Sequence, residues 1–222
     1  MGAIETRERT VAAAYQLFEE RGYDGTSVDD IAERAGIGRS TFFRMFGSKE
    51  DVIFPEHDSL LASIEARLAG AVTTETRYVA VAEAARLVLL HYLAEGEVAR
   101  ARYRLTRSVP ALRAREIAGM QQYQRLFRTW IHRWYEGAPE AALRAELMAA
   151  AVVTGHNHVL RGWLRGLTED PMADFDRAMV EVMRLFAGGP DEEAGTTVIV
   201  LRTPRQVESV LPQVRAALIA EE

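Results

Sequence analysis

Residues 22–52 read GYDGTSVDDIAERAGIGRSTFFRMFGSKEDV and encode short helices with clear boundaries. Ser27, followed by Asp30 three residues later, is the capping-box pattern of a helix start. Gly36 would end that helix, and a second short helix follows after a few residues. Two short helices joined by a tight turn that contains glycine are the layout of a helix-turn-helix motif. We therefore expect this motif over about residues 27–46.

Further helices are expected on both sides of the motif. Within residues 6–22, apolar side chains recur at i, i+3 and i+7 on one helical face, namely Val11, Ala14 and Phe18. Gly22 is placed to end that helix, and Ser48 is placed to cap the next one. Residues 1–50 are therefore expected to form a small helical DNA-binding domain.

Positive charge is concentrated in residues 36–49. The chain has a net charge of −5, yet this stretch contains no Asp or Glu, and Lys49 is the single lysine of the sequence. On the helix expected at about 39–46, the inward stripe is Phe42, Met45 and Phe46, and the outward face is Arg39, Ser40, Phe43 and Arg44. Such a face can contact base edges and phosphates in a major groove. The charge pattern alone leaves a solvated basic helix equally open.

The stretch resembles the N-terminal domain of TetR-family transcriptional regulators over about residues 7–60. The matching pairs and motifs, in order, are Gly22-Tyr23, Thr26-Ser27, Ile31-Ala32, Ala35-Gly36, Thr41-Phe42-Phe43, and Phe46 with Lys49. The resemblance implies DNA contacts from Thr26, Ser27, Gly38, Arg39, Ser40, Thr41, Phe43, Arg44 and Lys49. Two positions depart from the family pattern: Phe43 lacks the usual tyrosine hydroxyl, and Gly38 stands where serine or threonine often caps the recognition helix.

The remainder of the chain predicts long helices and a different tail. The expected helices are 48–70 with a kink at Pro55, 75–96, 97–108, 110–136, 139–166 and 171–187. Residues 51–187 would form a helical domain for effector binding and dimerisation. Residues 188–222 would be a C-terminal extension, with a linker, a strand at about 196–203 and a helix at about 204–220. The fold class is therefore all-α, apart from that short strand.

The resemblance implies two roles for the long helices. Residues 139–166 and 171–187 correspond to the pair that usually dimerises, so a homodimer on a palindromic operator is expected. An apolar stripe on the helix at 110–136 could line a cavity for an apolar or amphipathic effector, with His156 as a polar group; its residues are Met120, Tyr123, Phe127, Trp130 and Trp134. The alternative is that this stripe is simply core.

Other classes of site lack a signal in the sequence. There is no cysteine, and His156 and His158 are two residues apart, so they would point to different faces of a helix. We therefore expect no metal and no cofactor. Catalytic motifs are absent, and so we expect no enzyme. The apolar stretches are too short for a membrane span, and the N-terminus lacks a secretory signal, so a cytoplasmic protein is expected.

Together these patterns predict a dimeric repressor that a small-molecule ligand releases from DNA, with a pivot at Pro55. A constitutive architectural DNA-binding protein without a ligand is the main alternative, and an enzyme of unrecognised type is the other.

Overall fold

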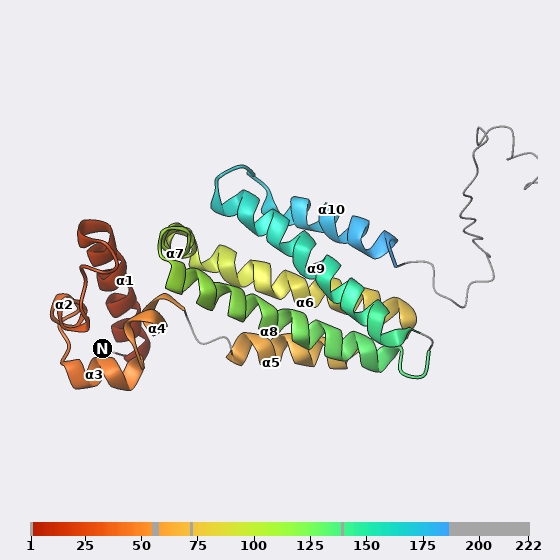
Figure 1. The fold of residues 1–222 in the computed structure, drawn as a ribbon, viewed down its shortest axis with the longest axis horizontal. Coiled ribbons are helices and arrows are strands. Elements are labelled where there is room, and N and C mark those ends of the chain that lie inside the picture. Colours follow the sequence, from red (N-terminus) through yellow and green to blue (C-terminus); the bar gives the residue numbers. More distant parts are fainter. Residues whose placement is uncertain (1, 55–57, 72, 139, 187–222) are drawn as a thin grey trace, which may run out of the picture. The chain divides into compact units, whose positions relative to one another are not determined.

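The computed structural model describes residues 2–54, 58–71, 73–138 and 140–186, in which the regular secondary structure is helical (Figure 1). The helices are α1 (Ala3–Arg21), α2 (Val28–Arg34), α3 (Arg39–Met45), α4 (Lys49–Ile53), α5 (Asp58–Ala69), α6 (Thr74–Glu95), α7 (Glu97–Ser108), α8 (Pro110–Trp134), α9 (Ala141–Leu164) and α10 (Pro171–Arg184). No strand occurs in these ranges. The all-α fold class is confirmed, whereas the strand and the helix expected after residue 188 lie outside the described residues.

The first four helices enclose one hydrophobic cluster. Phe18 of α1, Ile31 of α2 and Phe42 of α3 lie at its centre and are almost fully buried. Ala101 of α7 and Leu112 of α8 complete the cluster, so the longer helices cover one side of this domain. The apolar stripes expected on α1 and α3 are thus the faces that these helices bury.

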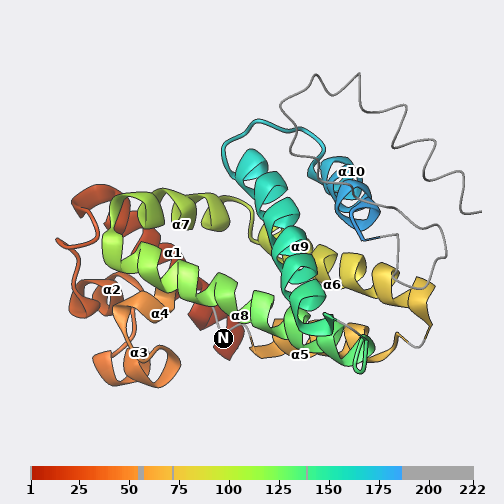
Figure 2. The ribbon, with the colours of Figure 1, turned by 45° about the vertical axis from the view of Figure 1, so that its right-hand side comes forward.

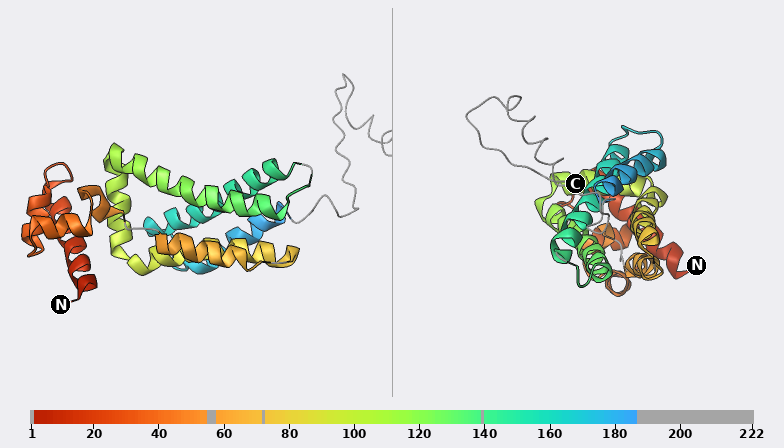
Figure 3. Two further views of the ribbon diagram at one scale, coloured as in Figure 1. Left: turned by 90° about the horizontal axis from the view of Figure 1, so that it is seen from below. Right: turned by 90° about the vertical axis from the view of Figure 1, so that its right-hand side faces the viewer.

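A second cluster lies between the long helices. It is formed by buried side chains of α5, α6, α8, α9 and α10, with Leu89, Phe127 and Phe175 among the largest. Helices α8 and α9 are neighbours, and α10 lies along α9 (Figure 2). Helices α5 and α6 also lie side by side (Figure 3). No described helix has both the length and the apolar character that crossing a bilayer requires.

The expected single helix over residues 48–70 is wrong, because the structure has two helices there. Helix α4 ends at Ile53, and Phe54 is extended, with φ −105° and ψ 106°. Proline disfavours a helical conformation in the residue before it, so Pro55 ends this helix instead of kinking it. The pivot expected at Pro55 lies outside the described residues.

Candidate nucleic-acid interface and ligand cavity

Helix α3 has one buried face and one exposed face. Phe42 and Phe46 are 0% and 3% exposed, and they anchor the helix in the N-terminal cluster. The residues on the opposite face are all exposed, namely Arg39, Ser40, Phe43 and Arg44, whereas Thr41 is half-buried. Gly38 is the N-cap residue and provides no side-chain cap. The structure therefore presents the polar and cationic face that the sequence predicts.

The two exposed arginines of α3 differ in whether they form an ion pair. Arg39 Nη1 lies 2.5 and 2.6 Å from the two carboxylate oxygens of Asp29 on α2, and its guanidinium lies 5.2 Å from the Phe43 ring centroid. This ion pair is exposed, and exposed pairs add little stability, so it can open at small cost. Arg44 forms no ion pair with any described residue, which leaves its guanidinium available to a phosphate or a base.

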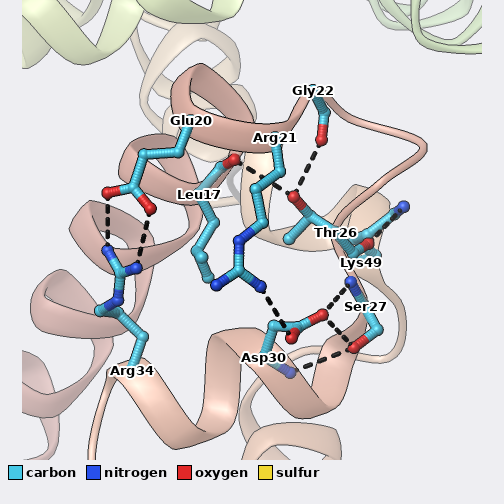
Figure 4. Close-up of polar contacts among 9 residues, drawn as sticks. All are labelled: Leu17, Glu20, Arg21, Gly22, Thr26, Ser27, Asp30, Arg34 and Lys49. Carbon is cyan, nitrogen blue, oxygen red and sulfur yellow. Dashed lines mark hydrogen bonds and ion pairs between the residues drawn. The ribbon is translucent and has the colours of Figure 1, made fainter.

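Two residues that the sequence assigns to DNA contact are used inside the domain. The Thr26 hydroxyl is buried and donates to the carbonyl oxygen of Gly22 at 2.8 Å (Figure 4). The Lys49 ammonium donates to the carbonyl oxygens of Tyr23 and Thr26 at 2.8 and 2.9 Å. It therefore fixes the turn before α2, with only one of its three N–H donors left over. We revise both residues from direct DNA contacts to positioning residues.

The start of α2 is fixed by the capping box that the sequence predicts. Ser27 Oγ accepts from the Asp30 amide at 3.1 Å, and the Asp30 carboxylate accepts from the Ser27 amide at 2.8 Å. Two ion pairs then tie α1 to α2: Arg21 with Asp30 at 3.2 Å, and Arg34 with Glu20 through two hydrogen bonds (Figure 4). The Ser27 hydroxyl lies at the surface but is occupied by this cap.

Two arginines of α1 support the motif, and the sequence analysis missed them. Arg7 Nη1 donates to the Met45 carbonyl at 2.9 Å and stacks over Phe46, and Arg9 Nε donates to the Ala35 carbonyl at 3.0 Å. These carbonyls lie at the C-terminal ends of α3 and α2, where backbone carbonyl oxygens have no partner within their own helix. Nothing in the local sequence marks Arg7 or Arg9, since both bonds join residues far apart in the chain.

A cavity of about 400 Å³ lies between α6, α7, α8 and α9. Four of the expected ligand residues line it: Met120, Tyr123, Phe127 and His156. Trp130 and Trp134 do not line it, because they lie further along α8, where they pack partly buried against the core. The volume is within the range of cavities that hold small molecules.

His156 is a neutral polar group in the wall of this cavity. Its ring is 6% exposed, and burial lowers its pKa to about 4. The ring Nδ1 lies 3.2 Å from Asn157 Oδ1, and Nε2 has no hydrogen-bond partner among the described residues. His158 is exposed, so the two histidines point to different sides of α9, as their spacing predicts.

A family model described as bacterial regulatory proteins, tetR family, matches residues 11–54, which include the whole helix-turn-helix motif. Residues 11–54 are therefore similar to the N-terminal domain of TetR-family proteins. This is a family of regulators and not of enzymes. The match covers α2, α3, α4 and the C-terminal part of α1, and so the resemblance noted in the sequence is confirmed.

Curated relatives share parts of this sequence. TcmR of Streptomyces glaucescens is 41% identical over 69 residues, which are 29% of this chain and 30% of TcmR. MftR of Mycobacterium tuberculosis, named as a candidate transcriptional regulator of mycofactocin biosynthesis, is 28% identical over 172 residues, which are 73% of this chain and 84% of MftR. The chain spans less than a third of the length of the first three curated relatives it matches.

Two solved structures share the fold. NalD, the secondary repressor of the MexAB-OprM multidrug efflux pump in Pseudomonas aeruginosa, superposes with a TM-score of 0.55 at 20% identity, covering 82% of this chain and 97% of that one. A TetR-like transcriptional regulator from Rhodococcus superposes with a TM-score of 0.52 at 20% identity, covering 85% and 100%. The helical fold of this chain is therefore similar to theirs.

One buried arginine connects the cavity with α4. Arg102 of α7 is 3% exposed and lines the cavity. Its guanidinium forms a two-point ion pair with Glu95 of α6, and its Nη1 donates to the Ile53 carbonyl, at the end of α4, at 3.4 Å. Arg115 of α8 and Asp51 of α4 form a second ion pair. The DNA-binding helices are thus linked through hydrogen bonds to the cavity wall.

Proposed function

We propose that this protein is a TetR-family DNA-binding transcriptional regulator that acts as a homodimeric repressor and is released from a palindromic operator by a small molecule. The observation that carries the proposal is α3, a short helix anchored by buried Phe42 and Phe46, with Arg39 and Arg44 exposed on its outer face. A helix with this face fits the major groove, where guanidinium groups bind guanine edges and phosphates.

Two-fold symmetry is supported by the outer faces of α9 and α10. Leu143 and Leu147, one turn apart on α9, are 52% and 54% exposed, and Val180 of α10 is 49% exposed. Large apolar side chains that remain exposed in neighbouring positions favour a protein interface. A second copy packed on this face would give two recognition helices, which read half-sites about 34–36 Å apart when one DNA turn separates them.

Ligand release is supported by the position of the cavity. A second hollow, between the N-terminal helices and α8, is also lined by Tyr92, Arg102, Glu116, Met120 and Tyr123, so these residues form a wall common to both. A ligand that moves this wall also moves Arg102, which donates a hydrogen bond to the Ile53 carbonyl at the end of α4. The ligand must bind the DNA-free arrangement more tightly, and a hundredfold preference supplies about 2.7 kcal/mol.

DNA binding is tested by fluorescence anisotropy with DNA from upstream of the protein's own gene, over a salt series. Wild type is expected to bind with steep salt dependence, because bound phosphates release counterions. Arg44→Ala should weaken binding by about 10-fold or more. Arg125→Ala, which removes an exposed arginine of α8, is the matched control and should bind as wild type does.

If wild type fails to bind this DNA, selection from a random DNA pool follows. Failure to enrich any palindromic sequence would contradict the proposed function. Equal loss of affinity in Arg44→Ala and Arg125→Ala would show that α3 is not the reading helix.

A further inference from the structure

The cavity between α6 and α9 has an uneven distribution of charge. Its charged lining residues are five arginines and one glutamate: Arg102, Arg107, Arg113, Arg161, Arg165 and Glu116. This excess of positive charge occurs in a chain whose net charge is −5. Arg102 is neutralised by Glu95, but the other four arginines form no ion pair with a described carboxylate. All four are exposed, so they belong to the solvent-facing part of the cavity lining.

Two of these arginines already converge on one oxygen atom. Arg165 Nε donates to the Tyr103 hydroxyl at 2.8 Å, and Arg107 Nη1 donates to it at 3.3 Å. Burial acts to raise the pKa of Tyr103, but these two hydrogen bonds outweigh it, and the pKa is lowered. The phenol oxygen therefore occupies a place where the local field favours a negatively charged oxygen.

The deep end of the cavity has the opposite character. Val88, Phe127, Val152 and Leu160 give it an apolar surface. His156, a polar residue there, is uncharged near neutral pH because burial lowers its pKa to about 4, and Arg102, the buried arginine of the lining, is already paired with Glu95. A charged group would lose its hydration at this end without gaining a partner, whereas an alkyl or aryl group would gain by leaving water.

We propose that the cavity binds an amphiphilic anion, with its apolar tail against Val88, Phe127 and Leu160 and its single carboxylate or phosphate group held by Arg107 and Arg165 at the opening. The inference rests on the proposed function in that it takes this cavity to be the effector site. A neutral hydrophobic compound would leave the four arginines without an anionic partner, and a cation would be repelled by them.

The test is isothermal titration calorimetry on the full chain without DNA, at low salt. The probes are dodecanoate, dodecyl phosphate, 1-dodecanol and dodecyltrimethylammonium, each below its micelle concentration. Dodecanoate or dodecyl phosphate should bind at least about 10-fold more tightly than the neutral and cationic probes, because charge-assisted hydrogen bonds form only with the anions. Whichever of the two anions binds more tightly identifies the head group as carboxylate or phosphate.

Variants place the head group. Arg107→Gln with Arg165→Gln should weaken anion binding by about 10- to 100-fold. Arg104→Gln, an exposed arginine of α7 that does not line the cavity, is the control and should have no effect. Tyr103→Phe should tighten anion binding, because it frees both guanidinium groups from the phenol oxygen. If the double variant lost anion binding only because it misfolded, Tyr103→Phe would not bind the anions more tightly than wild type.

Equal binding of dodecanol and the anions, anion binding insensitive to the double variant, or no binding of any probe would overturn the inference. These outcomes are separable from failure of the proposed function, since DNA binding is measured independently. A protein that binds operator DNA but none of the anions retains the function and loses the inference. A protein that binds an anion through Arg107 and Arg165 but binds no DNA retains the inference and loses the proposed function.

Discussion

Lys49 is the single lysine of the chain, and its surroundings show why an ammonium group is suited to this position. The compact group donates to the carbonyl oxygens of Tyr23 and Thr26 and lies 3.9 Å from the Tyr23 ring centroid. An arginine would bring a planar fork to a site shaped for a point charge. Arg44, five residues earlier, has the opposite situation, since it is exposed and unpaired with any described carboxylate.

Lys49→Ala is expected to lower the free energy of unfolding by about 1–3 kcal/mol, because two backbone carbonyls lose a charged donor. Urea unfolding followed by circular dichroism measures this change. Arg44→Ala serves as the contrast: it should leave stability within about 0.5 kcal/mol of wild type while weakening DNA binding. Equal stability of Lys49→Ala and wild type would show that the Lys49 ammonium group is available to bind a DNA phosphate.

His156 makes stability depend on pH. Its pKa is about 4 in the folded protein, below its ordinary value of 6.5, so between these values the unfolded chain binds more protons than the folded one. Stability from this group is therefore complete above pH 6.5 and is lost as the pH falls toward 4, at about 1.4 kcal/mol per unit.

His156→Gln should flatten this dependence. Urea unfolding at pH 7.5 and pH 5 should show a loss on acidification that is smaller by about 2 kcal/mol in the variant than in wild type. His158→Asn, which replaces the exposed histidine of α9, should keep the full wild-type loss. Identical pH slopes in His156→Gln and wild type would show that His156 is not buried in its neutral form.

The close contact between α9 and α10 depends on a glycine, which has no side chain to hold the two helices apart. A Cβ atom added at Gly155 of α9 would lie 3.0 Å from both Met179 Cε and Val182 Cγ2 of α10. Gly119 of α8 is the opposite case, because a Cβ atom there would meet nothing within 4 Å. Glycine at 155 thus allows the two helices to approach closely, whereas glycine at 119 has no such packing reason.

Gly155→Val is expected to destabilise the protein by about 1–3 kcal/mol, since the added methyl groups force α10 away from α9. Gly119→Ala is expected to stabilise it by about 0.5–1 kcal/mol, because alanine loses less backbone entropy in a helix. Thermal and urea unfolding of both variants measure the two changes. Stabilisation by Gly155→Val would mean that α10 can shift at little cost.

The whole protein is proposed to function as a symmetric pair, and its exposed leucines allow this to be tested. Leu143→Arg combined with Leu147→Arg should convert the dimer into a monomer, because like charges would face each other across the two-fold axis. Multi-angle light scattering measures the mass, for which the monomer value is 24.8 kDa. The same variant should lose binding to a palindromic operator.

Val79→Arg is the control for this experiment, since Val79 is 50% exposed but lies on α6. It should remain dimeric. A monomeric wild type, or a double variant that stays dimeric, would place the interface elsewhere.

Local chemistry is sufficient to predict the helices and the recognition face. The box of Ser27 and Asp30, the glycines at 22 and 36 and the spacing of Phe42 and Phe46 act within a few residues, so they can be identified in the sequence and are found in the structure. The break after Ile53 differs from the kink that the sequence predicts, because a proline can either kink a helix or end it, and the local sequence does not distinguish the two.

Contacts between distant residues could not be predicted in the same way. The contacts of Lys49 with Tyr23, Arg102 with Ile53, and Arg165 with Tyr103 each join segments that only the packing of helices brings together. Sequence periodicity places a residue on a face of its helix but does not specify which helix that face will meet. For this reason the cationic face of α3 could be recognised from the sequence, whereas the charge of the cavity opening followed from the packing of α7 against α9.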